Sequence, residues 1–219
     1  MKKPRLTNEQ MAARVGLELE DGYWVNLGIG LPMLVSTHIP PGRTVYFQSE
    51  NGILGAGPHA RPDQRDCDLS NAGDEDITEI LGASFFDSSI SFAMIRGGHL
   101  DVTVLGGFQV SEAGDLANWK LPHRAVGSFG GAMDLAVGAK KVIVLMKHTT
   151  TDGQPRVVKE CTYPLTGKAC VNMIVTDLGV IDVTSNGLML REVAPGWSAK
   201  EVSELTEARL ITNNMGQIS

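Results

Sequence analysis

The sequence FQSENGILGAGP, residues 47–58, joins a predicted strand to a glycine-rich turn. The strand, at residues 44–48 (TVYFQ), is rich in β-branched and aromatic side chains, as buried strands are. Asn51 and Gly52 favour a turn because both residue types tolerate positive φ angles. The turn therefore presents the carboxylate of Glu50 at the carboxyl end of a strand, where ligands of open α/β sheets bind.

A carboxylate in this place can act as a base, an acid, a metal ligand or a nucleophile. The alternative is a solvated loop acid that caps the following turn, and such acids outnumber functional ones. Gly55 and Gly57 let the backbone approach a ligand or another part of the chain closely, which either interpretation allows. The pattern of residues 47–58 alone does not decide between them.

Short apolar runs elsewhere alternate with helix-like or glycine-rich segments. We expect further strands at residues 23–27, 77–81, 102–105, 142–146 and 178–183, and helices at residues 8–22, 32–38, 88–96 and 198–209. Buried strands that alternate with helices predict an α/β fold with an open, largely parallel sheet and flanking helices. The chain of 219 residues, 42% of them hydrophobic, is expected to form a single domain over residues 1–219.

Charge and composition exclude several classes of partner. A formal net charge of −6 argues against nucleic acid or an anionic membrane as the main partner. No apolar run approaches the roughly 18 to 20 residues that span a bilayer, so we expect a cytoplasmic protein. Cys67, Cys161 and Cys170 show no metal-binding spacing and are expected to be reduced, mostly buried thiols. The sequence predicts no metal site.

A second glycine turn follows the predicted strand at residues 23–27. Gly28 and Gly30 precede Pro32, a residue that favours the first turn of a helix. Free backbone N–H groups at such a turn suit an anion or a developing oxyanion, although a tight turn without a ligand explains the same residues. The run is not a dinucleotide-binding fingerprint, because Met33 stands at the third glycine position.

Several other polar residues are better explained structurally. His99 and Asp101 share one face of a strand, but a histidine that begins a core strand is more often a structural hydrogen-bonding group. Asp115 and Asp134 are expected to cap or bridge loops. Cys161 has no histidine beside it in sequence and is not expected to be a nucleophile.

Five glycine-punctuated blocks occur along the chain in one order. They are NLGIGLP (26–32), QSENGILGAGP (48–58), MIRGGHLD (94–101), GDLANW (114–119) and GGAMDL (130–135). Together they resemble the β subunit of the family I 3-oxoacid CoA-transferases, and the resemblance runs from about Met11 to about Arg209. The ordered set is far more specific than any one block.

The resemblance implies the open α/β fold of the CoA-transferases, which is isomerase-like, and it makes Glu50 the catalytic nucleophile. It assigns oxyanion or CoA contacts to further residues, which are Asn26, Gly28, Gly30, Asn51, Gly52, Gly131 and Ala132. No metal or other cofactor is implied, because CoA arrives as a thioester substrate. The resemblance also implies an α subunit, in a complex of the α2β2 type, and acyl-CoA and small carboxylic acids as substrates.

On this hypothesis Glu50 carries CoA from succinyl-CoA to a 3-oxo acid of the acetoacetate type as a glutamyl-CoA thioester, with ping-pong kinetics. The alternative is the β subunit of a 3-oxoadipate CoA-transferase, to which the block ECTYPLTG at residues 160–167 is slightly closer. A sugar-phosphate isomerase or sensor would need a lysine or arginine inside the glycine turns, which hold none. A non-catalytic partner with the same fold is disfavoured by the intact Glu50.

Three positions depart from the pattern of the family, and one of them is Phe129, which stands where relatives usually carry methionine. Ser70 stands where relatives usually carry a hydrophobic residue in the LxNAG block, so we expect a small local repacking. Lys147 replaces the acid that commonly precedes the histidine at position 148. The sequence analysis assigns no role to Lys147 or His148.

Overall fold

The computed structural model describes residues 3–122, 125–128, 130–212 and 216–218. Its helices are α1 (Asn8–Gly16), the 3₁₀ helix η1 (Leu31–Thr37), α2 (Ser88–Arg96), α3 (Ala132–Gly138) and α4 (Ala199–Glu204). The strands of the large sheet are β1 (Trp24–Leu27), β2 (Tyr46–Ser49), β3 (Ile53–His59), β4 (Ile77–Phe85), β5 (Val102–Leu105), β8 (Lys141–Leu145), β10 (Met173–Val175), β11 (Gly179–Thr184), β12 (Gly187–Val193), β13 (Leu210–Ile211) and β14 (Gly216–Gln217). A small sheet contains β6 (Gln109–Ser111), β7 (Leu116–Ala117) and β9 (Val157–Val158).

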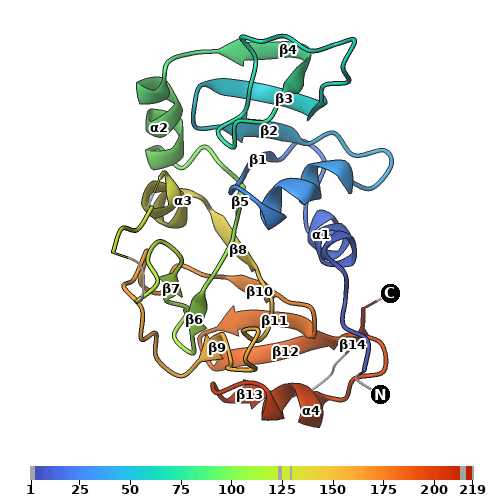
Figure 1. The fold of residues 1–219 in the computed structure, drawn as a ribbon, viewed down its shortest axis with the longest axis vertical. Coiled ribbons are helices and arrows are strands. Elements are labelled where there is room, and N and C mark those ends of the chain that lie inside the picture. Colours follow the sequence, from blue (N-terminus) through green and yellow to red (C-terminus); the bar gives the residue numbers. More distant parts are fainter. Residues whose placement is uncertain (1–2, 123–124, 129, 213–215, 219) are drawn as a thin grey trace.

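The centre of the large sheet is parallel. Within the described residues its order is β13-β12-β11-β10-β8-β5-β1-β2-β3-β4, with β14 beside β12 (Figure 1). Five consecutive strands of this order, β10, β8, β5, β1 and β2, pair with one another in parallel. The pairs β2–β3, β3–β4, β10–β11 and β11–β12 are antiparallel. The predicted α/β fold with an open, largely parallel sheet is confirmed, and the segments after β1, β2, β5 and β8 meet at one edge.

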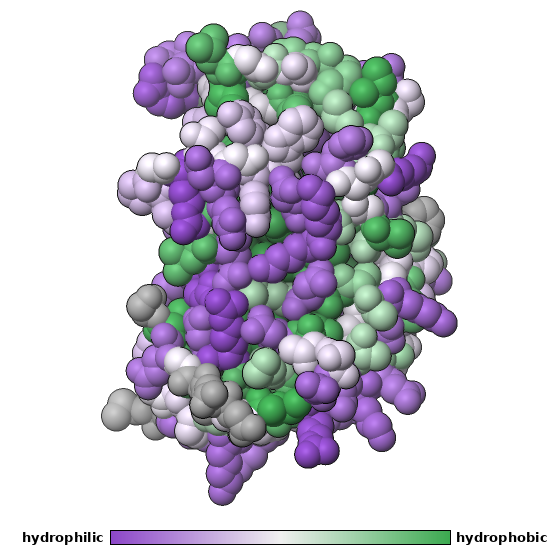
Figure 2. All heavy atoms as spheres, turned by 180° about the vertical axis from the view of Figure 1, so that it is seen from behind, coloured by the Kyte–Doolittle hydropathy of each residue, from purple (hydrophilic) through white to green (hydrophobic). Residues whose placement is uncertain are grey.

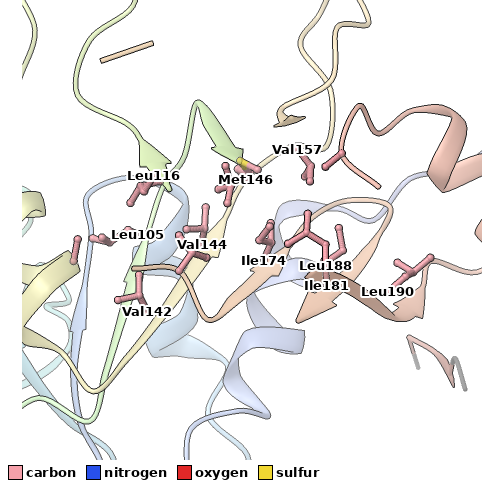
Figure 3. Packing of buried hydrophobic residues seen from close by; sticks show 14 of the residues in the cluster. Leu105, Leu116, Val142, Val144, Met146, Val157, Ile174, Ile181, Leu188 and Leu190 are labelled. Carbon is pink, nitrogen blue, oxygen red and sulfur yellow. The ribbon is translucent and has the colours of Figure 1, made fainter. Parts of the chain in front are cut away.

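Hydrophobic side chains fill both faces of the large sheet. Alternate residues of β8 point to opposite faces. Val142 and Val144 join one cluster (Figure 3), while Ile143 and Leu145 join the other. The helices α2 and α3 and the small sheet contribute to the first cluster, and α1 and η1 to the second. The two clusters share the strands β8, β10 and β11. A single domain over residues 1–219 is consistent with this and stays a prediction.

The first helix begins where the sequence predicts and ends earlier. Thr7 and Gln10 form a capping box, with each side chain bonded to the backbone N–H of the other residue. The helix ends at Gly16, not near Gly22, because the chain turns there against η1. A Cβ at Gly16 would overlap the carbonyl oxygen of His38.

Other element boundaries also differ from the predictions. The helix expected after Pro32 is the 3₁₀ helix η1, and the helix expected over residues 198–209 is the shorter α4. The strand expected at residues 77–81 continues to Phe85 and runs antiparallel to β3. Strand β3 itself was predicted as part of the glycine-rich turn.

The glycines of β3 allow its close packing on β4. A Cβ at Gly55 would lie 3.0 Å from the Ala83 Cα, and one at Gly57 would lie 2.6 Å from the Thr78 Oγ1. The close backbone approach predicted for these glycines is therefore an approach to the neighbouring strand. Glycine within a strand often marks such a contact, although it weakens the strand signal in the sequence.

The described part of the chain contains no helix that is long and apolar enough to cross a membrane. On the face seen in Figure 2, hydrophilic side chains are spread widely, with smaller apolar areas between them. The three cysteines are free, as expected, but Cys67 is exposed and the other two are half-buried. The expectation that the thiols are mostly buried is therefore wrong for Cys67, which lies in the polar loop at residues 60–76.

A buried ion-pair network ties α1 to the far part of the sheet. The Arg14 guanidinium donates to both Glu192 carboxylate oxygens, at 2.7 and 2.6 Å, and to Glu18 at 3.0 Å. Burial opposes ionisation of Glu18, but hydrogen bonds from Lys141 and Arg14 and the nearby Arg191 outweigh it and lower the Glu18 pKa. The network is therefore charged at neutral pH.

We predict that Arg14→Leu lowers the free energy of unfolding by about 3 kcal/mol, because the poorly hydrated Glu192 would lose both hydrogen bonds from Arg14 and Glu18 would lose one of its donors. Lys200→Met is the control, since the Lys200–Glu204 pair is exposed, with 4.0 Å between its charged atoms. Breaking that pair should cost less than about 0.5 kcal/mol. Urea unfolding measures both values, and equal effects would contradict the prediction.

Candidate active site

Glu50 directly follows β2. A buried side-chain amide on the neighbouring strand β1 contacts its carboxylate. Asn26 lies on β1 at the position paired with Gln48 of β2. Its Nδ2 donates a hydrogen bond to the Glu50 Oε2 at 3.2 Å. Asn26 is fully buried, whereas Glu50 is partly exposed. The amide therefore contacts a carboxylate that solvent or a ligand can still reach.

Buried polar side chains fix the orientation of that amide. The Asn26 Nδ2 also donates to the Gln48 Oε1 at 2.8 Å and to the Gln48 carbonyl at 3.2 Å. The Gln48 Nε2 in turn donates to the Ser91 Oγ, which donates to the Ser49 carbonyl at 3.2 Å. A chain of hydrogen bonds thus runs from α2 through β2 and β1 to Glu50. Gln48 and Ser91 were not among the site residues predicted from the sequence. A signal was available for Gln48, because it is a polar residue inside a strand that was predicted to be buried.

Gly131 closes the other side of the Glu50 carboxylate. A Cβ built on Gly131 would lie 3.0 Å from the Glu50 Oε1 and 3.2 Å from the Phe92 Cε1. Gly131 is the N-cap of α3, whose first residue is Ala132. The backbone at the start of α3 thus comes as near to the carboxylate as a residue without a side chain allows.

Glu50 lines a cleft of about 510 Å³ at the carboxyl edge of the parallel strands. The wall is built largely from glycines and apolar residues that follow β1, β5 and β8 or precede α3. These residues include Gly28, Ile29, Leu31, Pro32, Leu105, Gly106, Gly107, Phe108, Gly130, Gly131, Ala132, Leu135, Leu145 and Met146. Its polar lining comes from Asn118 and Ser128, and its other charged residues are Lys147 and Arg156. A cleft of this size suits a small organic ligand.

The structure brings most of the predicted site residues together. Asn26 touches Glu50, and Gly28, Gly131 and Ala132 line the same cleft. Gly28 packs tightly on β5, because its Cβ would lie 3.2 Å from the Val104 carbonyl oxygen. These residues come from sequence positions more than a hundred residues apart.

Three predicted residues do not line this cleft. Gly30 has a φ of 89° and forms the turn into η1. The Asn51 Nδ2 donates to the Ser70 carbonyl at 2.6 Å, so Asn51 holds the loop that contains Ser70. Gly52, with a φ of 126°, packs where a Cβ would overlap the Phe86 carbonyl oxygen. Gly30, Asn51 and Gly52 therefore shape the turns around Glu50 without lining its cleft.

Lys147 and Arg156 line the cleft, although no role was predicted for them from the sequence. Lys147 follows β8 by two residues and Arg156 directly precedes β9. The position of Lys147 could have been found by applying the strand-end rule to every predicted strand, since residues 142–146 were predicted correctly as a buried strand. Arg156 had no such signal, because β9 was not predicted.

The acids interpreted as structural have structural partners. Asp101 accepts hydrogen bonds from the Trp24 N–H at 2.9 Å and from the Lys140 ammonium at 2.8 Å. Burial opposes ionisation of Asp101, but these two bonds outweigh it and lower its pKa. Asp134 pairs with Arg96 at 2.7 Å, and Asp115 accepts from a backbone N–H of a neighbouring loop at 2.9 Å.

His148 is a buried structural residue beneath the cleft. Its ring nitrogens lie 2.9 Å from the hydroxyl oxygens of Thr176 and Thr206. Burial lowers the pKa of His148 to about 4. The ring is therefore neutral at physiological pH and adds no charge to the neighbouring Lys147.

Metal-ligating groups gather at one exposed place within the described residues. Asp66, Cys67 and Asp68 bring one ligand atom each within 4.8 Å of one another in the polar loop. These groups are all solvent-exposed and lie apart from the cleft lining. Acidic surface groups of this kind are common in proteins, and we assign no metal to them.

We predict that Cys67 is alkylated by iodoacetamide at pH 8 while the other two thiols are protected. Burial raises the pKa of Cys161 and of Cys170 to about 11, with the charge of Asp115 acting in the same direction. About one buried thiol in a thousand would be ionised at pH 8, and the fraction should rise about tenfold per pH unit. Peptide mass mapping measures each site, and unfolded protein is the control. Equally fast labelling of Cys161 and Cys67 would contradict the prediction.

Curated relatives match nearly the whole chain. The β subunit of a probable succinyl-CoA:3-ketoacid coenzyme A transferase from Bacillus subtilis is 51% identical over 200 residues, which cover 91% of this chain and 93% of the relative. The β subunit of a 3-oxoadipate CoA-transferase from Acinetobacter baylyi is 48% identical over 213 residues, covering 97% and 98%. The chain is thus similar in sequence and length to two transferases with different acids in their names.

Solved structures share the fold at much lower identity. The acyl-CoA transferase YdiF from Escherichia coli O157:H7 superposes with a TM-score of 0.77 at 18% identity. The match covers all of this chain and 44% of the YdiF chain. At this level of identity the likeness shows the fold alone.

The sequence profile described as "Coenzyme A transferase" matches residues 8–205, which contain Glu50 and the lining of its cleft. The profile thus covers most of the chain. The two relatives described above match nearly the whole chain and are also named as CoA transferases. The resemblance found in the sequence is thereby confirmed. This chain belongs to the coenzyme A transferase family.

Proposed function

We propose that this chain is the catalytic β subunit of a CoA-transferase that moves CoA from succinyl-CoA to a 3-oxo acid. The observation that carries the proposal is the Glu50 carboxylate, held between the Asn26 amide and Gly131 at a cleft of small-ligand size. A carboxylate can conserve the energy of a thioester by becoming an acyl anhydride and then a thioester itself. The names of the Bacillus and Acinetobacter relatives support the same reaction class.

In the first half-reaction, a Glu50 oxygen attacks the thioester carbonyl of succinyl-CoA, and the carbon–sulfur bond breaks to release CoA thiolate. The thiolate then attacks the glutamyl carbonyl of the mixed anhydride, which releases succinate and leaves a glutamyl-CoA thioester. The acceptor carboxylate attacks this thioester and expels the thiolate, and the thiolate takes the new acyl group from the second anhydride. Glu50 returns as a carboxylate, so the cycle needs no net proton transfer.

Each attack places negative charge on a carbonyl oxygen, which needs preorganised donors. The Asn26 Nδ2 and the backbone N–H groups of Gly131 and Ala132 are the proposed donors, because Asn26 contacts the Glu50 carboxylate, Gly131 lies beside it and Ala132 lines the same cleft. A single donor of this kind is worth about 3 to 4 kcal/mol in comparable sites. Gly28 is proposed as a CoA contact from its place in the cleft, and Gly30, Asn51 and Gly52 as residues that shape the surrounding turns.

We further propose an α subunit as partner, in a complex of the α2β2 type, and a cytoplasmic location. Both relatives described above are named as single subunits of their transferases, which implies a partner chain in each. Large apolar side chains are exposed near the cleft, at Ile29 before η1 and at Met133 and Val137 on α3. Exposed apolar groups at the rim of a site favour a covering protein surface.

We predict that the complex, co-expressed with its α partner and mixed with succinyl-CoA, gains the mass of a CoA adduct on this chain. The adduct should map to Glu50, and borohydride should convert it to a reduced side chain, as it does for thioesters. Glu50→Gln should abolish the adduct and lower the transfer rate at least about a thousandfold. Glu79→Gln, at an exposed acid of β4, is the matched control and should behave like the unmodified chain.

An adduct at another residue, or transfer that persists in Glu50→Gln, would sink the proposed mechanism. An assembled complex that forms no adduct and exchanges CoA with no 3-oxo acid would instead support the non-catalytic alternative. Intact-mass analysis and rate measurement on the same preparation separate these outcomes.

We also predict that Gly131→Ala lowers kcat about a hundredfold, because the added methyl would press on the Glu50 carboxylate and displace it. The fold should be little affected, since the nearest atoms that the methyl would meet belong to the side chains of Glu50 and Phe92 and not to the backbone. Gly216→Ala is the control, as its Cβ would lie 3.6 Å from the nearest atom and far from the cleft lining. Steady-state kinetics with thermal unfolding measures both effects, and unchanged kcat in Gly131→Ala would show that Glu50 does not react in this position.

A further inference from the structure

We propose that Lys147 and Arg156 form an anionic-group pocket at one end of the cleft, which binds the second carboxylate of a dicarboxylic acyl group. The inference rests on the proposed function and deepens it, because it names the class of acid. On this view the transferase selects acids with a carboxylate at each end, such as succinate and 3-oxo dicarboxylic acids. Acids with a single carboxylate would be poorer substrates.

The backbone holds the two cations side by side. The Arg156 N–H donates to the His148 carbonyl at 3.0 Å, directly after Lys147. The Arg156 carbonyl accepts from the Val110 N–H at 2.9 Å, which ties the same segment to β6. His148 itself is anchored below by its two threonine contacts. Lys147 and Arg156 therefore extend from a fixed support into one cleft.

Neither cation has a carboxylate partner among the described residues. The Arg156 Nη1 donates only to the Gly107 carbonyl, at 3.4 Å, which leaves most of the guanidinium donors unused. Lys147 forms no ion pair there, and its influence on Glu9 is the last of several causes that lower the Glu9 pKa. The acid in the lining of the cleft is Glu50. Partly enclosed cations without partners favour an anionic ligand, and guanidinium matches the geometry of a carboxylate.

Glu50 and the two cations stand on different strands at one cleft. The strand β8 is separated from β2 by β5 and β1, so Lys147 and Glu50 stand about 14 Å apart across the sheet at roughly 4.8 Å per strand. Both side chains line the cleft. If a glutamate and a lysine side chain extend toward each other, they together bridge much of that distance. An acyl group that reacts at Glu50 can therefore direct its far end toward Lys147 and Arg156. A succinyl group carries a carboxylate at that end.

The phosphates of CoA are the other source of negative charge on the substrate. They lie at the far end of the long pantetheine chain, whereas the second carboxylate of a succinyl group lies within a few bonds of the reacting carbonyl. The two sources of negative charge differ in which substrates carry them. Phosphates are common to every acyl-CoA, and the second carboxylate belongs to dicarboxylic acids alone.

The test compares succinyl-CoA with butyryl-CoA, which has the same number of acyl carbons and a methyl group in place of the second carboxylate. The assembled complex is used, and formation of the Glu50 adduct is timed for each donor. The unmodified complex should prefer succinyl-CoA. Lys147→Met and Arg156→Gln should each lower kcat/KM for succinyl-CoA at least about tenfold and leave butyryl-CoA within about twofold.

Lys147→Arg should keep the preference, because it keeps the positive charge. Lys168→Met is the control, since Lys168 is exposed and outside the cleft lining. Equal losses for both donors would overturn the proposal in favour of phosphate binding, and an unchanged preference would overturn it outright. Folding is checked by the butyryl-CoA reaction, which a misfolded variant could not perform.

Acceptors provide a second comparison. The unmodified complex should use 3-oxoadipate better than acetoacetate, and Lys147→Met should remove most of that difference. Equal use of both acceptors by the unmodified complex would overturn the proposal for the acceptor half-reaction.

A failure of the proposed function has a different signature, because no donor would then form an adduct at Glu50. Calorimetry still measures the pocket in that case. Succinate should bind the unmodified complex more tightly than butyrate does, and Lys147→Met should remove the difference.

Discussion

The side-chain hydrogen bond between Asn26 and Gln48 is the constraint on which the site depends. These residues occupy paired positions on two parallel strands, so the register of β1 against β2 decides whether the amide faces Glu50. A slip of one residue would turn Asn26 to the opposite face of the sheet. The hydrophobic layers on both faces hold that register, and in this way core packing determines the position of the carboxylate that we propose to react.

The polar interior beneath the site is almost fully hydrogen-bonded. Within the described residues, the Asn26 Oδ1 and the Thr103 Oγ1 are buried without a hydrogen-bond partner. They occupy paired positions on β1 and β5, on the same face of the sheet. Buried groups without partners are rare in proteins and tend to mark places where polar interactions change.

Local sequence signals predicted the centre of the fold well. The strands β1, β2, β5 and β8 are short apolar runs that need no knowledge of their neighbours, and Glu50 follows directly from the end of one of them. The strands of the small sheet are two or three residues long and become recognisable only through their partners. Arg156 was missed for a related reason, because it directly precedes β9, which was not predicted. Lys147 follows a strand that was predicted, and only the strand-end rule had to be applied to it.

The separation of Glu50 from Lys147 across the sheet has a consequence for how such enzymes diversify. The reactive carboxylate and the cations at the other end belong to different strands, and no hydrogen bond of the Glu50 network within the described residues reaches the segment after β8. If the proposed pocket binds the second carboxylate, a substitution after β8 can alter which acid is accepted without disturbing Glu50. Chemistry and selectivity can then be inherited separately, and a lineage can acquire a new substrate by changing few residues.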